Sequence, residues 1–432
     1  MSVDDRNMIA LGRRASISFS GVDKHIVPGE TKIRLCNYLD VYRNRHLRSS
    51  IAYSPGSAKD VEIRRFQLQR GDILITKDSE TPDDIGIPAV VVDDLPNTIC
   101  GYHLALIRPN SELNSSFIGQ YLQSEQAKRH FLCYAAGATR FGLNLRAISS
   151  LLIPDIDIDE QSSVARILDA VDSVIEHTLT AIEHAKLLSR SLVRDLLECG
   201  VDETGAVRLK EISSNRFHTT EIGLLPESWV VKKLSDVAGV ERGRFSPRPR
   251  NDPRFYNGPF PFVQTGQIAK AKGRVITDYS QTLNIQGKAV SREFPAGTIM
   301  VTIAANIGET AILGIPMCAP DSLVGVIVKE SHSARFVELC LRRLRPRLLA
   351  IAPRSAQANI NLTTLKPLRI PVPLPAEQKR IASIVDAAEA KVVALESKID
   401  ALIQLKKSLM HDLLTGAVRV DPTLFKKEEE PL

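Results

Sequence analysis

The sequence lacks the features that mark several classes of protein. No apolar run reaches the roughly eighteen residues of a transmembrane helix, and the N-terminus, MSVDDRNMIALGRR, is polar and unlike a signal peptide. Six cysteines are far apart and form no C-x-x-C pair, and nine histidines are scattered. We therefore expect a cytoplasmic protein with reduced thiols and no metal site.

Motifs of several enzyme classes are missing as well. The chain has no G-x-x-x-x-G-K-[ST] loop, no G-x-G-x-x-G after a predicted strand and no G-x-S-x-G elbow. The tetrapeptide Asn251–Arg254 is not the N-P-P-aromatic signature of an amino-methyltransferase. We predict no catalytic residues and no cofactor.

One long segment occurs twice. Residues 153–197 superimpose on residues 370–414 at a shift of 217 without a gap, and about a third of the positions are identical. Asn144–Leu145 matches Asn361–Leu362 at the same shift, and FPAGTIMVTIAANIGETAIL parallels RGDILITK. The chain is therefore predicted to be two halves built on one plan.

Each copy switches from an extended run to helical periodicity at a Glu-Gln pair, and no proline or glycine interrupts it from there. Apolar residues alternate four and three apart, the pattern of a coiled-coil seam, which predicts two paired long helices. The seam residues, which we also expect to serve partner docking, are Val164, Leu168, Val171, Ile175, Ile182, Leu192, Ile381, Val385, Val392, Leu395, Ile399, Leu402 and Leu409.

Charge is distributed unevenly along the chain. Residues 219–370 contain 21 Lys and Arg against 11 Asp and Glu, whereas residues 153–218 contain 7 against 13. Basic globular blocks and acidic helices favour domains that contact phosphate and helices that contact protein.

The first block, up to residue 152, reads as a mixed α/β domain with many short strands and a helix at Ser115–Ala135. Its candidate DNA-binding residues are Arg43, Arg45, Arg48, Lys77 and Arg140.

The second block contains the most basic window, residues 241–274, which proline and glycine are expected to keep irregular. Arginine and lysine supply affinity for phosphate, and arginine or glutamine can read base edges. The candidates are Arg242, Arg244, Arg248, Arg250, Arg254, Gln264, Thr265, Gln267, Lys272 and Arg274. Phe260, Phe262 and Trp229 also fit core positions, and Gln264 also fits a structural amide.

These segments together resemble the specificity subunits of type I restriction–modification systems. The resemblance rests on FQLQRGDILITKDSETPDDIGIPAVV and GYHLALIRP in the first block, and on IGLLPESWVVKKLSDV, GPFPFVQTGQI and IPVPLPAEQ in the second. It implies an α+β fold with an internal pseudo-twofold repeat, in which an antiparallel coiled coil of two long helices joins two similar target-recognition domains. It also implies that each domain reads one half of a bipartite DNA target, and that the complex contains two methyltransferase subunits and motor–endonuclease subunits.

On this basis we expect recognition domains at residues 1–152 and 219–369, and long helices at 153–198 and 370–415. A linker occupies 199–218 and a polar tail 416–432. Two alternatives remain: a self-contained methyltransferase or endonuclease, and a coiled-coil scaffold that binds DNA without sequence preference.

Overall fold

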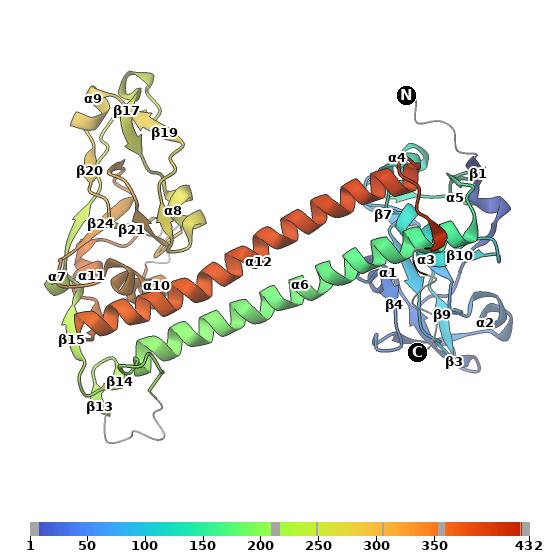
Figure 1. Ribbon diagram of the computed structural model, residues 1–432, viewed down its shortest axis with the longest axis horizontal. Coiled ribbons are helices and arrows are strands. Elements are labelled where there is room, and N and C mark those ends of the chain that lie inside the picture. Colours follow the sequence, from blue (N-terminus) through green and yellow to red (C-terminus); the bar gives the residue numbers. More distant parts are fainter. Residues whose placement is uncertain are drawn as a thin grey trace. The chain divides into compact units, whose positions relative to one another are not determined.

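The computed structural model describes residues 8–208, 217–247, 249–304, 306–352, 359–423 and 425. The chain divides into two compact units (Figure 1): Met1–Thr180 with Glu396–Leu432, and Ala181–Leu395. The first unit therefore combines segments from both ends of the chain, and each unit contains part of both long helices.

The first unit is built on a five-stranded sheet of order β2-β10-β6-β8-β4, in which only the edge pair β4–β8 is parallel. The strands are β2 (Ala15–Phe19), β10 (Leu104–Pro109), β6 (Ile73–Thr76), β8 (Pro88–Val91) and β4 (His46–Leu47). A second sheet has the order β5-β3-β9, with β5 (Ser54–Ala58), β3 (Thr31–Cys36) and β9 (Thr98–Cys100). Two-stranded pairs complete the unit: β1 (Met8–Ala10) with β12 (Leu152–Pro154), and β7 (Asp78–Ser79) with β11 (Phe141–Gly142).

Five short helices accompany these sheets: α1 (Tyr38–Arg43), α2 (Asp60–Phe66), α3 (Ser115–Tyr121), α4 (Glu125–Tyr134) and α5 (Leu145–Ser149). The predicted single helix over Ser115–Ala135 was wrong in one respect, because it is two helices. Ser124 separates them and caps α4, since its side chain accepts a hydrogen bond from the Ala127 amide at 3.2 Å.

The second unit repeats this order. Its five-stranded sheet, β16-β24-β21-β22-β18, again has a single parallel pair at the β18 edge. The strands are β16 (Ala238–Arg242), β24 (Leu323–Val328), β21 (Ile299–Thr302), β22 (Thr310–Leu313) and β18 (Val275–Ile276). The second sheet has the order β19-β17-β23-β20, with β19 (Gln281–Leu283), β17 (Tyr256–Phe262), β23 (Met317–Ala319) and β20 (Arg292–Phe294). Strand β15 (Val230–Lys233) pairs with β25 (Arg369–Val372) as β1 pairs with β12.

The helices of this unit are α7 (Leu234–Val237), α8 (Thr265–Ala271), α9 (Ile285–Ala289), α10 (Ala334–Ile351) and α11 (Leu362–Leu365), and a hairpin is formed by β13 (Phe217–Thr220) and β14 (Gly223–Pro226). The basic window predicted to be irregular includes β17 and α8, so that prediction was wrong for those residues. Asn144 and Asn361 each cap a short helix by accepting a backbone amide, from Ala147 and Thr364. The matching strand orders and caps confirm that the repeat extends through the globular domains.

Most of the repeated segment forms two long helices, α6 (Ile158–Cys199, 42 residues) and α12 (Pro375–Thr415, 41 residues). Both begin later than the predicted bounds of 153 and 370, because the first residues of the segment lie in strands β12 and β25. The two helices lie side by side (Figure 1). In the first unit Lys406 pairs with Asp172 at 2.8 Å and Arg419, beyond the end of α12, with Glu160 at 2.7 Å. Partner numbers rise on one helix as they fall on the other, so the helices are antiparallel. Every predicted seam residue is buried or half-buried.

Each unit has a core in which sheet residues pack against both long helices. In the first, Leu168 of α6 and Leu413 of α12 join Phe117 and Phe131. In the second, Leu196 and Ile381 join a cluster that includes Trp229. Trp229 is 1% exposed, as expected for a core anchor. Burial of such side chains removes apolar surface from water and stabilises each domain against its helix pair.

Candidate nucleic-acid interface

In the first unit, the predicted DNA-binding residues fall into two groups. Arg43, at the end of α1, and Arg48, after β4, are exposed. Arg45 between them is half-buried and forms an ion pair with Asp172 of α6. Arg45 therefore joins the domain to the helix, whereas Arg43 and Arg48 present their charge to solvent.

Lys77 and Arg140 belong to one polar cluster. The Asp78 carboxylate contacts the Lys77 ammonium at 3.5 Å and Nδ1 of His103 at 2.8 Å. Arg140 Nη2 lies 3.3 Å from the same His103 nitrogen. Lys77 Nζ is 4.7 Å from the centre of the Tyr102 ring, a cation–π distance. The fold thus brings together two cations that are 63 positions apart in the sequence.

Two tyrosines beside this cluster were not among the predicted residues. Tyr38 and Tyr42, on consecutive turns of α1, stack with ring centres 5.5 Å apart. The Tyr42 hydroxyl donates to Asp84 at 3.1 Å, and this bond together with the Asp84 charge raises the pKa of Tyr42. No helix was predicted at these residues, so their spacing of four residues next to a basic loop was the only signal in the sequence. Tyr42 is exposed and Tyr38 is half-buried.

In the second unit, Asp321 organises part of the arginine-rich window. Arg250 donates to its carboxylate at 2.8 Å and Arg242 to its backbone carbonyl at 2.6 Å. Arg292, also absent from the prediction, donates to the carbonyl of Arg242 at 2.9 Å and pairs with Glu241 at 3.1 Å. These bonds fix the directions of exposed guanidinium groups, each of which has further N–H donors for a ligand.

The remaining arginines of this window bind different acceptors. Arg244 donates to the carbonyl of Ser291 at 3.1 Å. Arg254 forms a bidentate pair with Asp252, and their hydrogen bonds raise the pKa of Arg254 and lower that of Asp252. Arg248 lies outside the described residues.

Of the predicted DNA-binding residues at α8, those at its start are half-buried and those after its end are exposed. The Gln264 backbone amide donates to the Gln267 side chain at 3.0 Å, and Gln264 Nε2 donates to Gln281 at 2.9 Å. Gln264 is thus a structural amide, while Thr265 beside it is half-buried. Lys272 and Arg274 follow the helix and are exposed. Phe262 is a core residue at 1% exposure, and half-buried Phe260 lies 4.2 Å from Lys288 Nζ.

Two acidic side chains on each long helix bind polar side chains of the adjoining globular domain, and they occupy equivalent positions of the repeat. In the first unit, Asp169 and Asp172 of α6 accept hydrogen bonds from Gln120, and Asp169 accepts another from Ser116. At the shift of 217, Asp386 and Glu389 of α12 bind the guanidinium of Arg335 at 2.7 and 2.5 Å. The repeated helices therefore hold their domains through the same positions with different donors.

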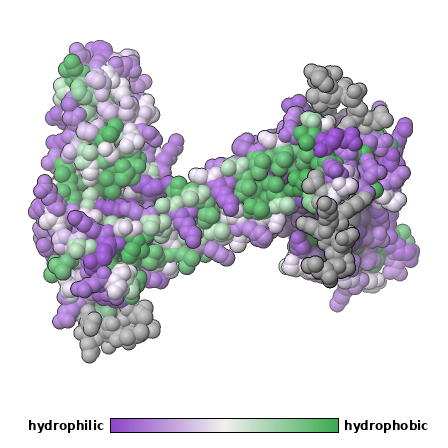
Figure 2. Space-filling model, viewed as in Figure 1, coloured by the Kyte–Doolittle hydropathy of each residue, from purple (hydrophilic) through white to green (hydrophobic). Residues whose placement is uncertain are grey.

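The long helices also expose apolar side chains that do not enter the seam. Figure 2 shows hydrophobic residues gathered along these helices. Those of α6 include Val174, Leu179, Leu187 and Leu188, and those of α12 include Ile403 and Leu405. Leu188 is 70% exposed and Leu187 61%. Such side chains on paired helices are typical of a surface that contacts another protein.

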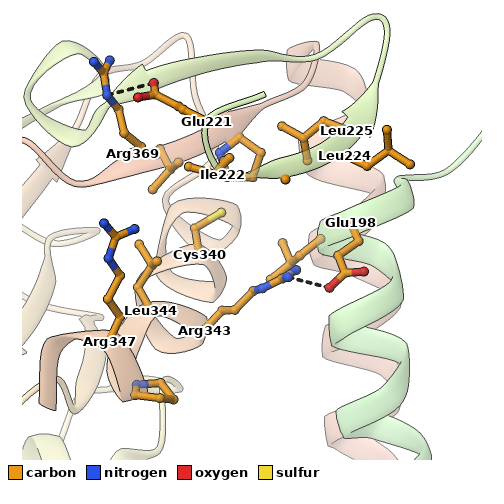
Figure 3. A pocket seen from close by; sticks show the side chains of 15 residues that line it. Glu198, Glu221, Ile222, Leu224, Leu225, Cys340, Arg343, Leu344, Arg347 and Arg369 are labelled. Atoms are coloured by element: carbon orange, nitrogen blue, oxygen red, sulfur yellow. Dashed lines mark hydrogen bonds and ion pairs between the residues drawn. The ribbon is translucent and has the colours of Figure 1, made fainter. Parts of the chain in front are cut away.

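A pocket of about 570 Å³ lies within the second unit, between the β13–β14 hairpin, β25, α10 and the end of α6 (Figure 3). Arg343 reaches across it to Glu198 at 2.6 Å, and Arg369 pairs with Glu221 at 3.0 Å. A larger cleft of about 830 Å³ in the first unit is lined by residues of α1, α4 and α12. Its rim includes the basic residues Arg43, Lys128, Arg129, Lys407 and His411.

The described residues contain no group of three potential metal ligands. Five of the six cysteines are buried, and burial raises the pKa of Cys36, Cys318 and Cys340, so these thiols are poor nucleophiles. Over the part of the chain that the structure describes, no helix has the length and apolarity needed to cross a membrane.

Comparison with known proteins finds a matching family model and several similar proteins. The family model of the type I restriction modification DNA specificity domain matches residues 226–405. The type I restriction enzyme MjaX specificity subunit of Methanocaldococcus jannaschii is 25% identical over 366 residues, which cover 84% of this chain and 82% of that protein. The EcoKI specificity subunit of Escherichia coli is 26% identical over 226 residues, 48% of this chain and 46% of that protein.

Two solved structures have a similar fold. The S subunit of a type-I restriction-modification system from M. genitalium superimposes with a TM-score of 0.56 at 14% identity, covering 95% of this chain and 97% of that one. A chain from a study of complex assembly and conformational transition of the type I R-M system gives a TM-score of 0.53 at 16% identity, covering 97% and 100%. At these identities the likeness concerns the fold alone.

Proposed function

We propose that this chain is a specificity subunit of a type I restriction–modification system, the family that it resembles in sequence and fold, and that it is the DNA-reading subunit of a multi-subunit methyltransferase and restriction enzyme. Each domain reads one half of a bipartite target, and the chain itself carries out no bond-making or bond-breaking step. Such a subunit acts in the cytoplasm, where the chromosome lies.

The observation that carries this proposal is the repeated sheet frame with different polar side chains on each copy. Exposed arginines and lysines on both domains neutralise phosphates and give salt-dependent affinity. Arginines whose directions are fixed by protein acceptors can donate two hydrogen bonds to a guanine edge. Since Lys77, Tyr102 and His103 on one domain differ from Arg242, Arg250 and Asp321 on the other, the two half-sites differ and the target is asymmetric.

The helix pair supplies the surface for partner proteins. We assign docking of the two methyltransferase subunits to this pair, with the motor–endonuclease subunits joining through them. The exposed Leu187 and Leu188 on α6 and Leu405 on α12 offer apolar contacts, while the seam residues keep the two helices together. The chain exposes such side chains on both helices, which fits one partner on each.

The experiment that tests the function co-expresses the chain with the methyltransferase encoded beside it in an unmethylated host, followed by mapping of modified bases by long-read sequencing. The expected result is one bipartite motif with two specified halves around an unspecified spacer. Methylation without such a motif would contradict sequence reading. Methyl transfer by the purified chain alone would instead support the self-contained enzyme.

A further inference from the structure

We propose that one turn in each unit positions the side chains that determine sequence specificity: the turn Gly101–Leu104 before β10, and the turn Pro320–Leu323 before β24. The proposal rests on the function proposed above and names the residues that carry it. In the first unit the determinants are Tyr102 and His103 with Lys77 and Arg140. In the second they are Arg242 and Arg250, held by Asp321.

The two turns occupy the same place in the repeated frame. Leu104 pairs with Thr76 of β6, and Leu323 pairs with Thr302 of β21. The Leu104 amide donates to the Gly101 carbonyl at 3.2 Å, and the Leu323 amide donates to the Pro320 carbonyl at 3.1 Å. The carbonyls of His103 and Ser322 accept from Lys77 and Ile303, both at 3.1 Å. Tyr102 therefore corresponds to Asp321, and His103 to Ser322.

The strands that pair with these turns, β6 and β21, both end at a buried threonine. Thr76 and Thr302 are completely buried, and the carbonyl of each accepts a glycine amide at 2.9 Å, from Gly86 and Gly308. Both glycines have a φ of +78°, a left-handed conformation that a side chain would strain. The backbone around the turns is thus the same in both units, while the side chains that it presents differ.

In both units this turn holds two of the cations predicted to bind DNA. His103 binds Asp78, which also contacts the Lys77 ammonium, and Tyr102 covers that ammonium. Arg140 Nη2 lies 3.3 Å from the His103 nitrogen that faces Asp78. Asp321 binds Arg250 through its carboxylate and Arg242 through its carbonyl. Two unrelated sets of side chains therefore place paired cations at the same position of the frame.

Fixed cations can discriminate bases where mobile cations cannot. A guanidinium held by a protein acceptor presents its remaining donors in one direction, so its two hydrogen bonds to a guanine form at a lower entropic cost. Exposed residues without such support, such as Arg43 and Arg48, add affinity for phosphate regardless of sequence. Specificity is therefore concentrated at the two turns rather than spread over all basic residues.

The test uses the complete complex of this chain with its methyltransferase subunit, and measures methylation of the mapped target and of its single-base variants. Asp321→Asn keeps the shape of the side chain but removes its charge. His103→Ala removes the imidazole that binds Asp78 and lies beside Arg140. The matched controls are Glu330→Gln in the second unit and Asp94→Asn in the first, which change exposed acidic residues away from both turns.

We expect Asp321→Asn to lower discrimination about tenfold at one base pair of one half-site, and His103→Ala to do so in the other half-site. Both controls should keep the wild-type pattern. Arg250→Lys, which keeps its positive charge, should alter the same base pair as Asp321→Asn without changing the dependence of binding on salt concentration.

The inference is overturned if Asp321→Asn and His103→Ala both keep wild-type discrimination at every position, or if either lowers methylation equally at all positions of both half-sites. These results would leave the proposed function intact, because the wild-type complex would still methylate a bipartite motif. A wild-type complex that methylates DNA without such a motif would contradict the proposed function itself.

Discussion

Glu377, the third residue of α12, shows how one buried side chain can hold several segments together. Its carboxylate accepts hydrogen bonds from Arg208 at 2.6 Å, from the Val201 amide at 3.0 Å and from the Trp229 indole at 3.2 Å. At the equivalent position of α6, Glu160 pairs with Arg419. Both arginines belong to the sequence Gly-Ala-Val-Arg, found after the end of each long helix. Each helix start is thus tied to the segment that follows the other helix.

The first prediction compares these two carboxylates. Glu377→Ala should lower the free energy of unfolding of the second unit by about 3–5 kcal/mol, since the half-buried Arg208 loses its partner. Glu160→Ala should cost the first unit less, because the Arg419 side chain is 68% exposed and can be solvated. Urea unfolding of both variants measures the difference. An equal loss would contradict the argument from burial.

A second prediction concerns pH and Asp172. Burial opposes ionisation of this carboxyl, but Arg45, Gln120 and Lys406 outweigh that effect, so its pKa lies below the ordinary 3.8. A lowered carboxyl pKa contributes stability above the unfolded-state value, and this stability is lost as the pH falls through the folded-state value. The difference in unfolding free energy between wild type and Asp172→Asn should therefore be constant near neutral pH and shrink below about pH 4. Urea unfolding at several pH values, with Asp94→Asn as control, measures it. A difference that does not change with pH would count against the ion pairs.

At the scale of elements, the seam of the two long helices differs from their outer faces. Ile399 is 8% exposed, whereas Leu188 is 70% exposed. Ile399→Asp should destabilise the first unit by on the order of 3 kcal/mol, because it places an unpaired charge among apolar side chains. Leu188→Asp should change stability by no more than about 0.5 kcal/mol.

The same pair of variants separates folding from docking. Leu188→Asp should weaken co-purification with the methyltransferase subunit while thermal unfolding stays unchanged. Ile175→Asp, at a half-buried seam position, should fall between Ile399→Asp and Leu188→Asp in stability. If Leu188→Asp retains its partner fully, the outer face of α6 is not the docking surface.

The long helices were predictable because a seven-residue pattern without proline or glycine has few alternatives. The predicted repeat ends at Leu197 and Leu414, and the helices end at Cys199 and Thr415. Positions in the DNA-binding site were harder to predict. The excess of arginine was visible, but the role of Asp321 depends on strand pairing that brings it beside Arg242, 79 positions away. No local pattern marks Tyr102 and Asp321 as equivalent, because the equivalence lies in their strand registers.

At the scale of the molecule, the first unit is made from both ends of the chain. Leu413, Leu414 and Val420 are buried in the same core as Phe117 and Leu168. The second unit, by contrast, is formed by the continuous segment Ala181–Leu395. The first copy of the repeat therefore needs a segment from the far end of the chain to complete its unit, whereas the second copy does not.

Ending the chain at Leu414 should consequently affect the first unit alone. The change removes Arg419 and Val420, so Glu160 loses its ion pair with Arg419 and the core loses an apolar side chain. Hydrogen exchange should become faster in α3 and the first turns of α6. It should stay unchanged in β21 and β24. Faster hydrogen exchange in the second unit, or an unchanged exchange rate in the first, would contradict this division.

This arrangement also has a consequence for synthesis of the protein on the ribosome. Leu413 is added to the chain 245 positions after Leu168, and the two belong to the same core. At about 5–20 residues per second, this interval lasts roughly 12–50 seconds. During that time the core face of the first domain that α12 later covers remains open, and the whole second unit, Ala181–Leu395, is synthesised. The domain translated first is therefore the last to be completed.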